Sequence, residues 1–167
     1  MRTWIVAVGL CLFCFIIPLQ CFIIGDNSGF GIQGAVLRWQ MTEKGISLIP
    51  ITTEMGYVTT GLYTGKTALM VIFWTLGTAA LSLTTILSLI YWNQLPRTYL
   101  RLILIGLISA GILYLASCIS QYGPLFHGPA GVSLPVGILV IFIFTGCLYF
   151  FQNSLYPDEI IPPDQCK

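Results

Sequence analysis

The sequence predicts an all-α integral membrane protein, a four-transmembrane-helix bundle with a small extracytoplasmic β-hairpin between the first and second helices. Three observations lead to this fold class. Hydrophobic residues make up 56% of the chain and charged residues only 8%, with a mean hydropathy of +0.88, which is unlike soluble domains. The hydrophobic residues gather in four long runs. One segment between the first two runs instead alternates apolar and polar residues.

Each apolar run is long enough to span a bilayer, which takes about 20 residues for about 30 Å of hydrocarbon. The first run is longer than the core of a usual signal peptide and no small-x-small cleavage site follows it, so it is expected to remain as a span. Pro18 is expected to bend this span, and Gln20 to be solvated near its outer end. No run has an ionisable side chain in its interior, which argues against proton relays and ion pathways. The four predicted spans are 4–24, 67–92, 99–120 and 132–151.

The positions of the cations predict the orientation. Arg97 and Arg101 flank the turn at 93–98, whereas the connection at 121–131 contains neither lysine nor arginine. The positive-inside tendency therefore places the first of these turns in the cytoplasm. Both chain termini, including a tail at 152–167, are then cytoplasmic, and residues 25–66 and 121–131 are extracytoplasmic.

The segment 34–53 has the pattern of a β-hairpin. Two alternating stretches flank Thr42-Glu43-Lys44-Gly45, a turn whose glycine can adopt positive φ. Residues 52–65 are rich in β-branched and aromatic residues and are expected to add a third strand. An isolated hairpin is marginal in water, so it needs either the helix ends or a partner to cover it. The candidate partner-binding residues are Leu37, Trp39, Met41, Ile46, Leu48 and Ile51; the alternative, that they only cover the outer ends of the chain's own helices, stays open.

The layout of four spans, inside termini and a β-rich first outer loop resembles the claudin and peripheral-myelin tetraspan arrangement in topology. Claudin-type loops carry a tryptophan, a Gly-Leu-Trp element and two cysteines that bond within the loop. Here Trp39 and Gly61-Leu62-Tyr63 are present, but no cysteine lies between Cys21 and Cys118. No functional residue is therefore carried over from that family.

Small and hydroxyl-bearing residues form stripes on two of the predicted spans. In membranes such faces are where helices approach closely and share hydrogen bonds. We therefore expect them to pack helices, with a path for a neutral solute as the alternative. The residues are Thr75, Thr78, Ser82 and Thr85 on the second span and Gly106 and Ala110 on the third.

Residues that could carry chemistry are few and scattered. Cys11 and Cys14 have the only redox-like spacing, but they lie in the middle of a span and are interpreted as packing residues. His127 is the sole histidine and has no second metal ligand close in sequence. The polar candidates for catalysis from loops, interpreted as turn and hairpin surface residues, are Asp26, Glu43, Glu54 and His127. The sequence thus predicts no catalytic residue, no cofactor and no metal.

These observations favour a non-enzymatic membrane scaffold or interaction subunit. Its expected partners are membrane lipids and other membrane-protein subunits or further copies of the chain. A net charge of +1 leaves no basic surface for nucleic acid. The alternative is a channel, carrier or binder for a neutral solute or lipid that uses the hydroxyl stripe of the second span.

Overall fold

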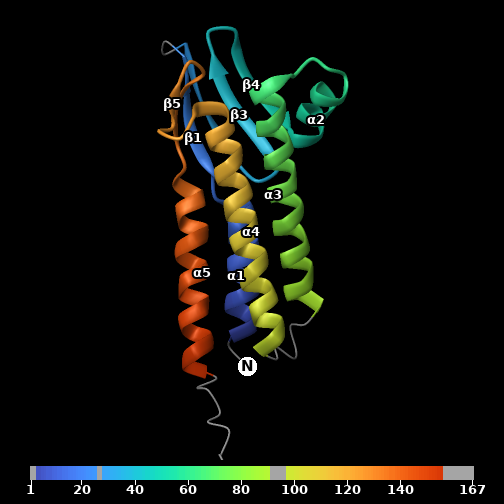
Figure 1. The fold of residues 1–167 in the computed structure, drawn as a ribbon, viewed down its shortest axis with the longest axis vertical. Helices are drawn as coiled ribbons and strands as arrows, with labels where there is room; N and C mark the ends of the chain where they lie inside the picture. The colour runs from blue at the N-terminus through green and yellow to red at the C-terminus, as the bar shows by residue number, and fades with distance from the viewer. Residues whose placement is uncertain (1–2, 26–27, 91–96, 156–167) are drawn as a thin grey trace, which may run out of the picture.

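The computed structural model describes residues 3–25, 28–90 and 97–155. Long helices run side by side along the molecule, and a β-sheet stands at one end of them with a short helix beside it (Figure 1). The helices of this part of the chain are α1 (Thr3–Ile16), α2 (Ile51–Thr59), α3 (Gly65–Ile90), α4 (Arg97–Tyr122) and α5 (Val136–Leu155).

The sheet is antiparallel, six-stranded and ordered β4-β3-β2-β1-β6-β5. Strands β1 to β4 follow one another as a meander, and the hairpin between α4 and α5 joins the free side of β1. Two connections far apart in sequence therefore build one sheet. Its strands are β1 (Gln20–Ile24), β2 (Gly29–Gln33), β3 (Leu37–Thr42), β4 (Gly45–Pro50), β5 (His127–Gly128) and β6 (Gly131–Leu134).

The predicted fold class, an all-α four-transmembrane-helix bundle with a small β-hairpin, is wrong. The described residues form five helices and a six-stranded antiparallel sheet. Among them, two helices are long and apolar enough to cross a membrane, over Gly65–Ile90 and Tyr99–Tyr122. The apolar part of α5, Val136–Phe150, is shorter.

Two of the apolar runs that the sequence predicts to be helical throughout contain a strand each. In the run 4–24, α1 ends at Ile16 because Pro18 lacks an N–H group and disfavours helical geometry at the residue before it. The rest of that run becomes β1, held between β2 and β6. The run 132–151 likewise begins in β6, and α5 starts only after Pro135. A short apolar run looks the same in a buried strand and in a helix, so periodicity could not separate them.

The strands of the expected hairpin pair with each other, with Thr42 opposite Gly45 across the turn. Gly45 has a φ of 119°, which a residue with a side chain rarely adopts. The expected third strand is instead helix α2. Pro50 precedes its first residue with extended geometry, and Glu54 lies in its first turn, where a negative charge favours a helix. The predicted cytoplasmic turn falls mostly on residues 91–96, outside the described residues.

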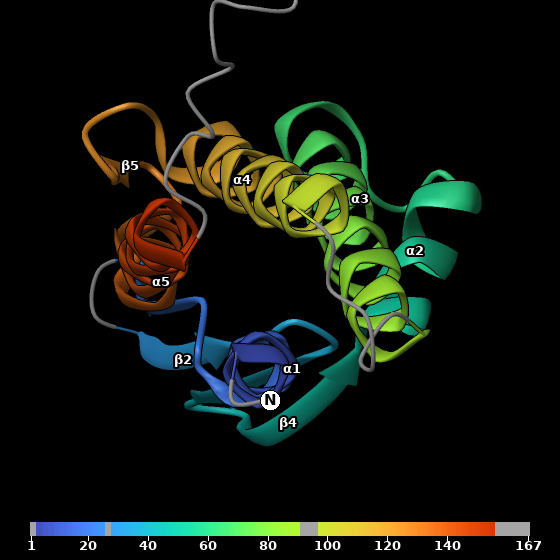
Figure 2. The same cartoon turned by 90° about the horizontal axis from the view of Figure 1, so that it is seen from below.

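Helix α3 connects the bundle to the sheet. It packs closely on α4, since a Cβ atom on Gly106 would come 2.1 Å from Thr84 Oγ1. Toward the sheet, the indole Nε1 of Trp74 donates to the Gly34 carbonyl at 3.0 Å, and the Thr78 hydroxyl donates to the Ala35 carbonyl at 2.5 Å. Seen along the helices, α1 and strands β2 and β4 lie on one side of the molecule, whereas α4 and β5 lie on the other (Figure 2).

Candidate functional site

The two faces of the sheet differ in chemistry, and the register assigns each residue to one of them. Residues directly opposite each other in an antiparallel ladder share a face, and alternate residues along a strand share it too. The face toward the helices, called the inner face below, is largely polar. One of its rows crosses four strands and consists of Gln20, Gln33, Arg38 and Ile49.

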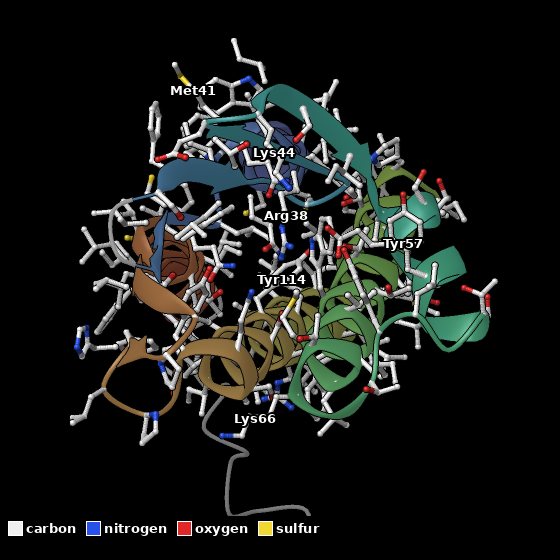
Figure 3. All side chains as sticks on the ribbon, turned by 90° about the horizontal axis from the view of Figure 1, so that it is seen from above. Arg38, Met41, Lys44, Tyr57, Lys66 and Tyr114 are labelled. Carbon is white, nitrogen blue, oxygen red and sulfur yellow. The ribbon has the colours of Figure 1, made fainter. Side chains whose placement is uncertain are left out.

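The opposite face, called the outer face, is apolar except for the exposed His127 at its β5 edge. Eight of its large side chains are exposed, from Ile32 at 37% to Ile46 at 67%. Figure 3 shows the contrast on one strand, since Arg38 extends toward the middle of the bundle whereas Met41 points away from it. The rows of the outer face are Leu134, Cys21, Ile32, Trp39 and Leu48, then His127, Val132, Ile23, Phe30, Met41 and Ile46, with Leu37 and Pro50 beyond them.

Arg38 is the centre of the inner face, and its guanidinium is buried among groups from different elements. Its Nη1 lies 3.0 Å from Glu54 Oε1 of α2, and both side chains are less than a tenth exposed. The aromatic rings of Phe22 and Trp74 lie 5.4 and 5.6 Å from the guanidinium carbon, within the range of cation–π attraction. Its Nη2 also lies 3.2 Å from the sulfur of Met70 on α3. Arg38 thus joins α2, α3 and the sheet.

From Arg38 a buried line of hydrogen bonds crosses the sheet to α4. Arg38 Nη2 donates to Gln33 Oε1 at 2.8 Å, and Gln20 Nε2 donates to the same oxygen at 2.7 Å. The Ser133 hydroxyl donates to Gln20 Oε1 at 3.0 Å, and the Cys118 thiol donates to the Ser133 oxygen at 3.4 Å. This line, called the inner network, satisfies polar groups that would be costly to bury alone. It fixes the sheet on the helix ends.

The buried position of the Arg38–Glu54 ion pair disfavours the charged form of Glu54. Burial raises the pKa of Glu54, and the neighbouring guanidinium of Arg38 lowers it only in part. Within the described residues, Arg38 Nε and Glu54 Oε2 are buried without a hydrogen-bond partner. Loss of either member would leave a buried charge without a counter-charge, which is costly.

Five of the six predicted partner-binding residues lie on the outer face. Leu37, Met41, Ile46 and Leu48 are exposed there, and Trp39 is half-buried with its ring centroid 5.3 Å from that of Phe30. Ile51 is not on this face, because it begins α2 and packs against the core. The strand register therefore places five of the six predicted partner-binding residues on one face of the sheet.

The predicted hydroxyl stripe on α3 is occupied by hydrogen bonds to backbone. Thr75, Ser82 and Thr85 each donate to the carbonyl four residues earlier, and Thr78 reaches both Trp74 and the sheet. Tyr114 of α4 adds a bond to the Thr78 oxygen at 3.2 Å. On the facing helix α4, Ala110 is fully buried and Gly106 meets Thr84. The bonds of Thr75, Ser82 and Thr85 therefore stay within α3, and Thr78 is the stripe residue whose bonds reach α4 and the sheet.

An open groove of about 280 Å³ lies between α4 and α5. Two of its lining residues carry hydroxyls, and that of Thr145 donates to the Ile141 carbonyl at 2.7 Å. The other lining residues are apolar. The groove is lined by Leu104, Ile108, Phe142, Thr145, Gly146 and Tyr149.

The scattered chemistry-bearing residues do not converge. Cys11 and Cys14 are buried, Glu43 and His127 are exposed, and Asp26 is outside the described residues. Over 3–25, 28–90 and 97–155, no three histidine, cysteine or acidic side chains gather as metal ligands would. Glu54, interpreted from sequence as a surface residue, is fully buried.

Sequence reasoning missed the inner network, although signals for it existed. Gln20 was expected to be solvated, but it is 2% exposed because its strand lies at the centre of the sheet. Arg38 alternates with Leu37 and Trp39, so it faces the side opposite to the apolar residues. An arginine on the side opposite to the apolar residues, with the acidic residue Glu54 following it in the sequence, was a detectable indication of a buried ion pair.

Comparison of the chain with protein-family models and with curated proteins finds no match. The function is therefore argued from the sheet itself.

Proposed function

We propose that this protein is a multi-pass membrane interaction subunit that uses the outer face of its sheet to bind protein. The outer face carries the proposal. Monomeric proteins rarely expose contiguous apolar patches larger than a few hundred Å² in water, and such patches mark interaction sites.

The inner network supports this assignment. A sheet that only capped its own helices would turn its apolar residues toward them and its polar residues toward water. Here Arg38, Gln33 and Gln20 face the helices, while the apolar half of each strand is left for another molecule. The inner network fixes the position of the sheet without engaging any side chain of the outer face.

The proposed location is the cell membrane, with both termini cytoplasmic and residues 25–66 and 121–131 outside. The length and apolarity of α3 and α4 support membrane insertion. Arg97 and Arg101 begin α4 at the end opposite the sheet, which agrees with a cytoplasmic location for that end. The sheet then stands in water, where its apolar face has a driving force for association.

Cysteine labelling tests the orientation. In a Cys21→Ser background, Lys44→Cys is expected to react with a membrane-impermeant maleimide added to intact cells, and Asn93→Cys only after permeabilisation. The opposite pattern would invert the proposed topology.

Paired substitutions test the interaction surface. Ile46→Thr with Leu48→Thr places β-branched residues of strand-forming type at both positions of β4 but removes most of its exposed apolar surface. We expect this variant, extracted from native membranes in mild detergent, to be recovered in smaller complexes than the wild type. Its melting temperature is expected to equal that of the wild type. Leu125→Thr, which changes an 85% exposed leucine beyond the sheet, is the matched control. Unchanged complexes in the paired variant would refute the proposed function.

A further inference from the structure

The composition, area and direction of the outer face identify a partner for it. We infer that the outer face binds the outer face of a second copy of this chain in the same membrane, as a two-fold symmetric dimer. This inference rests on the proposed function and goes beyond it by naming the occupant.

The exposed area is that of one side of a stable interface. The eight exposed residues range from 37% to 67% exposure. At roughly 200 Å² for a fully exposed large residue, they amount to on the order of 800 Å², about what each partner buries in an interface of standard size. They are Ile23, Phe30, Ile32, Leu37, Met41, Ile46, Leu48 and Leu134.

The chemistry of the face suits self-pairing. A symmetric dimer brings the same patch of both subunits together, so any charge near the axis would meet a like charge. The outer face has no aspartate, glutamate, lysine or arginine in any row, and Glu43 and Lys44 stand apart in the turn at its end. Its single histidine, His127, lies at the β5 edge, away from the centre of the face. Two such sheets can stack with side chains interdigitating, at about 10 Å separation.

The direction of the face indicates where the second copy lies. The strands run obliquely along the long axis of the molecule, so the outer face points sideways from that axis (Figure 1). Helix α1 lies on the same side in the view along the helices (Figure 2). Its Leu12 and Ile16 are exposed, whereas the Phe13 ring lies 5.6 Å from that of Phe144 on α5. With the helices across a membrane, sideways means within the membrane plane, and α1 would pack beside its counterpart.

The register identifies the centre of the contact. The row Leu134, Cys21, Ile32, Trp39 and Leu48 crosses five strands, and Ile32 on β2 is its middle residue. A two-fold axis through the middle of the face therefore brings Ile32 near Ile32 of the second copy. Cys21 is the register neighbour of Ile32 on β1 and is a free cysteine. Strand spacing and sheet separation put the two Cys21 sulfurs within about 15 Å of each other.

A charge exchange at Ile32 tests the inference on the full-length protein in nanodiscs and native membranes. Ile32→Glu and Ile32→Lys each place like charges at the axis, and we expect the dimer dissociation constant to rise about tenfold or more. Co-expression of the two variants places opposite charges there and is expected to restore a mixed dimer, recovered through two different tags. Leu125→Glu, an equally drastic change on an exposed leucine away from the sheet, is expected to leave the dimer intact.

Cross-linking of the unsubstituted face gives a second measurement that does not depend on a substituted face folding. A bismaleimide with a short spacer is expected to yield a covalent dimer of the wild type, and Cys21→Ser is expected to abolish it while Cys147→Ser leaves it. A wild type that is monomeric and does not cross-link through Cys21 would overturn the second copy as occupant. Failure of the Glu and Lys variants to pair would do the same.

The outcomes separate this inference from the proposed function. If the wild type is monomeric in nanodiscs but Ile46→Thr with Leu48→Thr still reduces its native complexes, the face binds a different protein and only the second copy is refuted. If the protein is monomeric, complexes are unaffected, and brominated lipid quenches a variant that keeps Trp39 as its single tryptophan, the face lies on lipid and both proposals fail.

Discussion

The inner and outer faces of the sheet come from the same strands, yet they have opposite chemistry. The inner face carries Arg38, Gln33, Gln20 and Ser133, all buried and bonded to one another or to α2, α3 and α4. The outer face carries apolar side chains that are largely exposed. Specific polar contacts therefore attach the sheet to its own helices, and its apolar surface remains available for association. Substitutions on the two faces should therefore differ in what they damage.

The largest expected effect is on the ion pair of the inner face. Arg38→Met leaves Glu54 buried without its counter-charge and is expected to lower the free energy of unfolding by about 3 to 5 kcal/mol. Without Arg38 the pKa of Glu54 rises further above its usual value, so the folded state binds the proton more tightly than the unfolded state. The stability of this variant is then retained at low pH and lost as pH rises through the raised pKa.

Denaturation of the detergent-solubilised protein at about pH 5 and about pH 8 measures this effect, and the deficit should be larger at the higher pH. The double variant Arg38→Met with Glu54→Leu removes both charges and should recover much of the loss. A deficit that is equal at both pH values would mean that Glu54 does not titrate in response to Arg38.

A smaller loss is expected where the inner face is closely packed. A Cβ atom on Gly31 would come 2.4 Å from Phe22 Cζ and 2.7 Å from the Trp39 carbonyl oxygen. Gly31→Ala should therefore cost about 1 to 3 kcal/mol through overpacking. The control is Gly56→Ala on α2, where a Cβ atom would meet nothing within 4 Å. That change should be neutral or slightly stabilising in thermal melts, and equal losses for the two would contradict the close packing of the inner face.

Two hydroxyls of α3 allow a matched comparison, in which the larger expected loss of stability is intermediate between those of the inner and outer faces. Thr78→Val removes the donor to the Ala35 carbonyl at the sheet and should cost about 1 to 2 kcal/mol. Thr75→Val removes only a bond to Val71 of its own helix and should change stability by less than about 0.5 kcal/mol. Chemical denaturation of the two variants under one condition makes the comparison. A larger loss at Thr75 would contradict the role of Thr78 as the connection between bundle and sheet.

The smallest effect on folding is expected from the outer face. Ile46→Thr and Leu48→Thr change residues that are 67% and 60% exposed, so each should alter the unfolding free energy of the monomer by no more than about 0.5 kcal/mol. Monomer stability in detergent measures this directly. A loss comparable to that at Gly31 would mean that the outer face is part of the protein's own core, and the contrast between the faces would fail.

Some of this arrangement was predictable from local pattern. The turn at Thr42 to Gly45 and the alternation on either side of it predicted the β3–β4 hairpin, whose strands pair in the structure. The extent of the sheet was not predictable in this way. Strand β1 lies in an apolar run that fits a membrane helix equally well, and β6 is contributed by residues more than 100 positions away. Non-local pairing of this kind leaves no periodicity in either segment.

Neighbours a few residues apart are enough to set the long apolar helices α3 and α4, the turn of the hairpin and the alternation of two chemistries along β3, so these features could be predicted from the sequence. Only the tertiary structure decided which chemistry faces inward. That choice depends on Glu54 from α2, Met70 and Trp74 from α3 and the hydrogen bonds that continue to α4, which together stabilise a buried arginine. Desolvating a charge is costly unless several partners converge on it. Such convergence of distant residues exists only in the folded chain, and it is what turns the apolar side of the sheet outward.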